Sequence, residues 1–133
     1  MSKIDIINQV FDTGINDDNK KEISNAVSET LRSLDSGEIR VAESRDDGNW
    51  SVNEWAKKAI LLSFKLNQNK CIETNYTKFY DKVDSKFLHT SEDYLKKNNI
   101  RIVPQAIARH GSFIDKNVVL MPSFINIGAY DVL

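Results

Sequence analysis

The sequence lacks several features that would by themselves indicate a class of protein. Cys71 is the only cysteine, which excludes an internal disulfide and fits a reducing compartment. Eighteen basic residues nearly balance nineteen acidic ones, for a formal net charge of -1. No excess of charge therefore points to nucleic acid or an anionic membrane as a partner. No apolar run approaches the roughly 20 residues of a membrane span.

What is present fits a globular protein. The chain has 133 residues, of which 41% are hydrophobic and 28% charged, enough for a domain with a real core. The first ten residues mix charged and apolar side chains, unlike a signal peptide. We therefore expect a soluble, cytoplasmic protein.

Apolar residues recur at helical spacing in three segments, which predict a helix ending at Gly14, a helix over residues 17–34 and a helix over residues 53–66. The third stripe is widened by Ile60, Leu61 and Phe64, which predicts burial on several sides. The stripes themselves are Ile4, Ile7 and Phe11; Ile23, Val27, Thr30, Leu31 and Leu34; and Trp55, Ala59, Leu62 and Leu66.

Between and after these helices the signals are shorter. Alternation around Ile39 and Val41 predicts a strand, and Asp47-Gly48 predicts a hairpin turn before a return strand at Trp50. Residues 67–78 show no period and are expected to be irregular. Ser91 is expected to cap a short helix, and residues 100–104 predict a strand ended by a proline.

Residues 107–130 repeat every six positions. Apolar residues stand at Ile107, Phe113, Val119 and Ile125, and a small or polar residue follows each by four places. Such a repeat predicts a parallel β-solenoid, in which the first residue of each block points inward and three blocks close one coil. Two ordinary strands around a turn at Pro122 remain an alternative.

Five stretches resemble the bacterial tetrahydrodipicolinate N-succinyltransferases, and together they cover nearly the whole chain in order. They are LDSGEIRVAE, WAKKAILLSFKLN, YDKVDSKF, IRIVPQAIARHGSFI and NVVLMPSFINIGAY. The resemblance implies an α+β fold: a helix-rich N-terminal domain with a β-hairpin over residues 1–103, then a left-handed parallel β-helix starting in residues 104–133. We expect the first one to one-and-a-third coils of that β-helix, in truncated form.

The resemblance also implies a function in lysine and diaminopimelate biosynthesis. Members transfer a succinyl group from succinyl-CoA, a co-substrate, to a small dicarboxylate, hold no permanent cofactor and form homotrimers. Arg101 matches an arginine implied to bind a substrate carboxylate, which suits a guanidinium. An arginine that leads a strand is otherwise most often a solvated surface residue.

The match departs from the family at the last three residues, because Asp131 and Val132 do not continue its pattern. The family's acidic catalytic position lies beyond this point, so we expect no catalytic residue in this chain and an inactive fragment. The alternatives are a non-catalytic assembly or interaction module left from that enzyme, and, less favoured, a hexapeptide acyltransferase that uses an acetyl donor.

Other polar residues have simpler interpretations. His110 and His89 are expected in turns or loops, and their spacing from Cys71 gives no metal site. Cys71 is expected to be a semi-buried thiol. Asp46 and Asp47 belong first to a turn. Lys57 and Lys58 are expected on the wet edge of the third helix.

Overall fold

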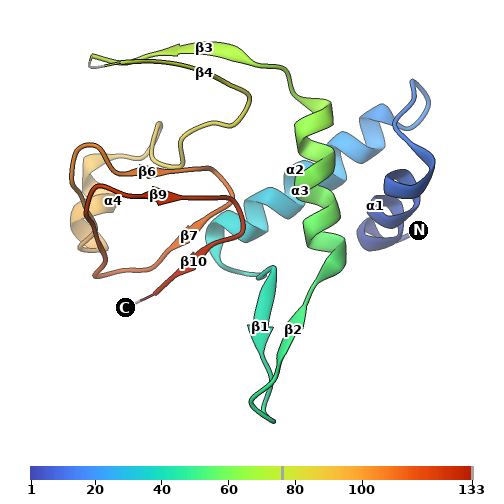
Figure 1. The fold of residues 1–133 in the computed structure, drawn as a ribbon, viewed down its shortest axis with the longest axis horizontal. Coiled ribbons are helices and arrows are strands. Elements are labelled where there is room, and N and C mark those ends of the chain that lie inside the picture. The colour runs from blue at the N-terminus through green and yellow to red at the C-terminus, as the bar shows by residue number, and fades with distance from the viewer. Residues whose placement is uncertain (76, 133) are drawn as a thin grey trace.

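The computed structural model describes residues 1–75 and 77–132. In this part of the chain, helices α1 to α3 lie together, and a stack of short strands with helix α4 lies beside them (Figure 1). Two β-hairpins project from this body in different directions (Figure 1). The fold is therefore mixed helix and strand, with its helices first and no closed sheet.

Helices α1 (Lys3–Thr13), α2 (Lys20–Ser36) and α3 (Glu54–Leu66) share one hydrophobic core. The predicted stripes largely hold, but Leu61 is 48% exposed and does not widen the buried face of α3. Ala56 and Ser63 are buried instead. The core residues are Ile7, Val10, Ile23, Ala26, Val27, Ala59 and Leu62.

The helix ends follow local chemistry. Ser2 and Asp5 form a capping box at the start of α1, and Gly14 ends that helix with φ of 96°. Helix α2 begins at Lys20, later than predicted. The reason is a turn in which the Asn16 side chain accepts hydrogen bonds from the backbone N–H groups of Asp18 and Asn19.

Two antiparallel hairpins flank α3. Strands β1 (Ala42–Ser44) and β2 (Trp50–Val52) confirm the predicted hairpin, and Gly48 takes a positive φ of 84° in its turn. Strands β3 (Lys70–Glu73) and β4 (Lys78–Asp81) form the second hairpin. The prediction that residues 67–78 are irregular was therefore wrong over most of this segment.

After the hairpins come a short helix and six two-residue strands. Ser91 caps α4 (Glu92–Lys97) by accepting a hydrogen bond from the Tyr94 N–H at 3.1 Å, as predicted. The strands are β5 (Arg101–Ile102), β6 (Ile107–Ala108), β7 (Phe113–Ile114), β8 (Val119–Leu120), β9 (Phe124–Ile125) and β10 (Tyr130–Asp131).

These strands pair in parallel with a constant separation along the chain. Arg101 of β5 pairs with Val119 of β8, 18 residues later. Ile107 of β6 pairs with Phe124 of β9, and Phe113 of β7 pairs with Tyr130 of β10, each 17 residues later. β8 and β9 pair with earlier strands and not with each other, so the alternative of an ordinary hairpin around Pro122 was wrong.

The predicted phase of the six-residue repeat was also wrong by one position. The second residue of each strand points inward, since Ala108, Ile114 and Leu120 are each only 3% exposed. Val119, predicted to point inward, is 50% exposed. A second core forms around these residues, and Phe87 and Leu95 pack against it from the preceding segment.

The helices meet the strands at a close contact. At Gly37, which ends α2 with φ of 81°, an added Cβ would lie 2.7 Å from the Phe113 ring. Only glycine combines this backbone conformation with room for the ring. The C-terminal end of α2 is thus seated directly on β7.

Candidate functional site

Arg101, the one predicted substrate-binding residue, opens β5. Its backbone N–H donates to the Val118 carbonyl at 3.1 Å, which fixes the strand against its neighbour. The side chain is exposed and, within residues 1–75 and 77–132, has no hydrogen-bond or ion-pair partner. The guanidinium therefore keeps its full capacity to bind an anion from solution.

The outward side of the β5–β8 pair is the open one. Val119 and Met121, on the strand beside Arg101, are 50% and 58% exposed. The β7–β10 pair differs, because the Arg40 guanidinium lies 4.0 Å from the Tyr130 ring centroid, which in turn packs on Phe113. Arg101 thus stands on a partly apolar surface that other side chains leave accessible.

His110 belongs to a polar junction and not to an acid–base site. Its Nδ1 lies 3.5 Å from Asp35 Oδ1, and that same oxygen accepts a hydrogen bond from the Gly111 N–H at 2.9 Å. Lys86 Nζ lies 3.0 Å from it. The carboxylate at the end of α2 therefore holds the first turn of the strand stack in place.

Arg109 makes a second junction, which the sequence did not predict. Its guanidinium donates to Asp81 Oδ2 at 2.8 Å and to Asn126 Oδ1 at 3.0 Å. The hydrogen bond from Arg109, helped by the backbone N–H groups of Lys82 and Val83, lowers the pKa of Asp81. No periodic signal marks such a contact, because its partners lie far apart in the chain.

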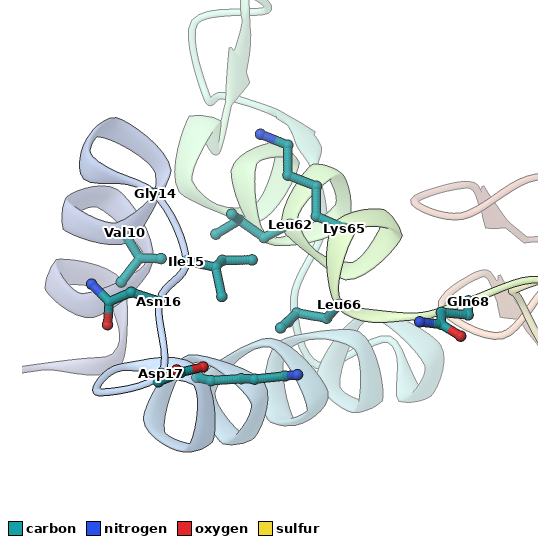
Figure 2. Close-up of a pocket in the computed structure, with 10 residues that line it drawn as sticks. Val10, Gly14, Ile15, Asn16, Asp17, Leu62, Lys65, Leu66 and Gln68 are labelled. Carbon is teal, nitrogen blue, oxygen red and sulfur yellow. The ribbon is translucent and has the colours of Figure 1, made fainter.

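Figure 2 shows the first of two surface hollows, between the α1–α2 loop and the end of α3. It has a volume of about 410 Å³ and an apolar floor in which Ile15, Leu62 and Leu66 come together. Its ionisable groups are Asp17, Lys20 and Lys65. This rim offers no nucleophile and base in contact, which covalent catalysis requires.

The second hollow, of about 460 Å³, lies between the end of α2 and residues 86–94. His89 lines it together with Lys86, whose side chain is only 10% exposed and already paired with Asp35. The predicted loop position of His89 is confirmed. The hollow is separate from Arg101, which does not line it.

The remaining predicted positions have structural roles. Asp47 accepts a hydrogen bond from the Asn49 N–H within its turn, as expected. Lys57 is exposed beside Glu54, whereas Lys58 is half-buried and donates to Asn8 Oδ1 at 3.2 Å. Cys71 is exposed, so the prediction of a semi-buried thiol was wrong. It lies on β3, whose strand character was not predicted.

Two general searches complete the site description. The part of the chain that the structure describes holds no group of three or more His, Cys, Asp or Glu side chains able to bind a metal ion. Among the same residues, each helix is too short or too polar to cross a membrane.

Comparison with known proteins adds what the geometry leaves open. The sequence model of a family described as "Tetrahydrodipicolinate N-succinyltransferase N-terminal" matches residues 4–66. An Acinetobacter baylyi protein named 2,3,4,5-tetrahydropyridine-2,6-dicarboxylate N-succinyltransferase is 53% identical over 128 residues, 94% of this chain and 46% of its own length.

Two further relatives carry the same name. The Neisseria meningitidis protein is 56% identical over 107 residues, 80% of this chain and 39% of its own length. The Acinetobacter baumannii protein is 52% identical over 127 residues, 93% of this chain and 46% of its own length. The chain thus spans less than half the length of these curated relatives. It belongs to the tetrahydrodipicolinate N-succinyltransferase family, whose N-terminal region it matches.

Proposed function

We propose that residues 1–133 form the helical part and the opening coils of an enzyme that transfers a succinyl group from succinyl-CoA to tetrahydrodipicolinate. The name shared by the relatives supports this reaction, which belongs to lysine and diaminopimelate biosynthesis. The parallel pairs, separated by 17 or 18 residues, support the opening of a left-handed parallel β-helix, since three hexapeptides make one coil.

Arg101 is proposed to bind one carboxylate of the dicarboxylate substrate. One observation carries this role: its guanidinium is exposed and, among the described residues, unpaired. A guanidinium binds a carboxylate through two parallel hydrogen bonds. In the proposed reaction the substrate nitrogen attacks the thioester carbon, a C–N bond forms, the C–S bond breaks and coenzyme A leaves as a thiol. Its nitrogen gives up a proton to an acidic group.

The described residues are proposed to supply binding and not the proton acceptor or the oxyanion donors. The polar junctions at Asp35 and Arg109 are internally paired, which leaves no free base beside Arg101. We therefore propose that residues 1–133 alone do not turn over substrate. The second candidate, a non-catalytic assembly module, is favoured by this same lack of a paired nucleophile and base in the described part of the chain.

The surroundings of the enzyme are proposals as well. The open β5–β8 surface, with Val119 and Met121 exposed, supports association into a homotrimer. A cytoplasmic location fits a biosynthetic enzyme that uses coenzyme A. The division into residues 1–103 and 104–133 stays a prediction, and β5 lies next to this boundary.

A chimera tests the proposed function. Residues 1–133 are joined to the remainder of the Acinetobacter baylyi relative, and thiol release from succinyl-CoA is measured. We expect turnover by the chimera and none by residues 1–133. Arg101→Ala in the chimera is expected to weaken substrate binding by about 10- to 100-fold, the loss of one charge-assisted contact.

The matched control is Arg45→Ala, which removes an exposed arginine from the β1–β2 turn. It is expected to leave substrate binding unchanged. If Arg101→Ala and Arg45→Ala chimeras bind substrate equally well, Arg101 is not part of the site. If residues 1–133 alone release thiol above a buffer blank, the missing base lies within them and the division of labour proposed above is wrong.

A further inference from the structure

The β3–β4 hairpin extends away from the helices as a separate arm (Figure 1). Its ends are tied down by the contact of Lys70 with Asp84 at 3.3 Å and of Asp81 with Arg109 at 2.8 Å. Between these points, every residue of β3 except Ile72 is exposed. A lone two-stranded hairpin is only marginally stable in water, so a partner for this arm would stabilise it.

The two faces of the arm differ in character. Ile72 pairs with Phe79 across the strands, and this face is apolar. Cys71 pairs with Tyr80 on the opposite face, where Tyr80 is 70% exposed. Glu73 and Lys78 form an ion pair at 3.2 Å that neutralises the tip. The arm therefore has exposed aromatic surface and no uncompensated charge between its ties.

The β3 edge has free hydrogen-bonding groups. The Thr74 N–H donates to the Thr77 carbonyl at 2.9 Å, so this pair is hydrogen-bonded. Because bonded and non-bonded pairs alternate along an antiparallel ladder, Ile72 bonds toward Phe79, while the backbone groups of Cys71 and Glu73 point outward. In Figure 1, β3 runs along the side of the arm away from the strand stack.

We propose that the β3 edge pairs antiparallel with β3 of a second copy of this chain, with Ile72 opposite Ile72. This inference does not rest on the proposed acyl transfer. It is the register in which both outward-facing residues of each strand, Cys71 and Glu73, oppose one another. A two-fold contact of this kind joins two hairpins into one four-stranded sheet.

The side chains are complementary in this register. One face becomes a continuous apolar row of Phe79, Ile72, Ile72 and Phe79, and no like charges stand opposite each other. The Glu73–Lys78 ion pair is retained in both copies. A shift by two residues in one direction would instead place Glu73 opposite Glu73, which is unfavourable.

Charge substitutions at Ile72 test the pairing and its register together. Ile72→Asp places two carboxylates opposite each other, and Ile72→Lys places two amines there. We expect the mass measured by sedimentation for each variant to be half that of the wild type. A mixture of the two variants is expected to restore the wild-type mass, because Asp then opposes Lys. This rescue also shows that both hairpins still fold.

Val52→Asp is the matched control, since Val52 is 48% exposed on the other hairpin. It is expected to keep the wild-type mass. Cys71, the only cysteine, gives a second readout, because the two Cys71 residues lie on a diagonal, about 7–8 Å apart. A short bis-maleimide should link wild-type chains in pairs but not Ile72→Asp chains. A mixture that stays at half mass, or equal dissociation by Val52→Asp, overturns the proposal.

Discussion

Asp35 and Lys86 lie 51 positions apart in the chain, and their side chains meet with 3.0 Å between Oδ1 and Nζ. Lys86 Nζ also donates to the backbone carbonyl of Asp35 at 2.7 Å. The amine therefore neutralises the carboxylate and also satisfies a carbonyl near the C-terminal end of α2. Through Gly111, which donates to the same carboxylate, this pair joins the helices to the strand stack.

Asp35→Ala is expected to lower the free energy of unfolding by about 2–3 kcal/mol, since it leaves a buried amine and the Gly111 N–H without their acceptor. Urea unfolding followed by circular dichroism measures this. Lys57→Ala, which removes an exposed ion pair with Glu54, is the control and should change stability by at most about 0.5 kcal/mol. Equal effects of the two substitutions would show that the Asp35 junction does not hold the parts together.

The contact of Arg109 with Asp81 predicts a dependence of stability on pH. The pKa of Asp81 is lower in the folded protein than the ordinary 3.8, mainly because of the hydrogen bond from Arg109. The unfolded chain therefore binds more protons in this range, and stability falls as the pH drops below about 4. Asp81 is partly exposed, with 39% of its side chain accessible, so solvent screening reduces the effect.

Asp81→Asn removes the titrating group and isolates this contribution. The difference in urea midpoint between wild type and Asp81→Asn is expected to be largest at pH 6 and to shrink as the pH approaches 3. Other carboxylates titrate in both proteins and cancel in the difference. A difference that stays constant from pH 6 to pH 3 would mean that the Asp81 carboxylate is not held by Arg109.

The helices could be predicted from the sequence, because each has a long stripe of apolar residues facing one core. The strand stack could be predicted only in outline. Its strands are two residues long, and in Phe113-Ile114, Val119-Leu120 and Phe124-Ile125 both residues are apolar. A period of six then identifies the repeat but cannot tell which member of each pair points inward.

The errors elsewhere have a similar physical origin. The β3–β4 hairpin exposes both faces, so its sequence shows no alternation of apolar and polar residues. The junctions at Asp35 and Arg109 join residues that are distant in the chain, and no local pattern marks them. Arg101 was chosen through its resemblance to a family motif; its strand position gave only the expectation of an exposed residue.

The phase of the repeat is itself testable. Leu120 is 3% exposed and Val119 is 50% exposed. Leu120→Ala is therefore expected to lower the free energy of unfolding by about 2–5 kcal/mol, through lost burial and a cavity. Val119→Ala should change it by no more than about 0.5 kcal/mol. Urea unfolding of both variants decides the phase, and a larger loss for Val119→Ala would restore the phase predicted from the sequence.

The last prediction concerns how stability is distributed along the chain. Helix α3 contributes Ala59 and Leu62 to a core shared with two other helices. Strands β8, β9 and β10 each pair with one strand only, within the residues that the structure describes. Their second edges and the exposed side chains of Val119, Met121 and Phe124 lack cover there. Bare strand edges open readily and favour association.

Amide hydrogen exchange of the 133-residue chain should therefore be faster over residues 111–132 than over α3. The two regions should also respond differently to a small amount of urea, because local opening of two-residue strands exposes little surface while opening of α3 requires loss of the helical core. Mass spectrometry of short peptides from each region measures both quantities. Ile72→Asp serves as a control, since it alters the arm and should leave this order unchanged. Equal protection of the two regions in a monodisperse sample of that variant would show that the strand edges are already covered in solution.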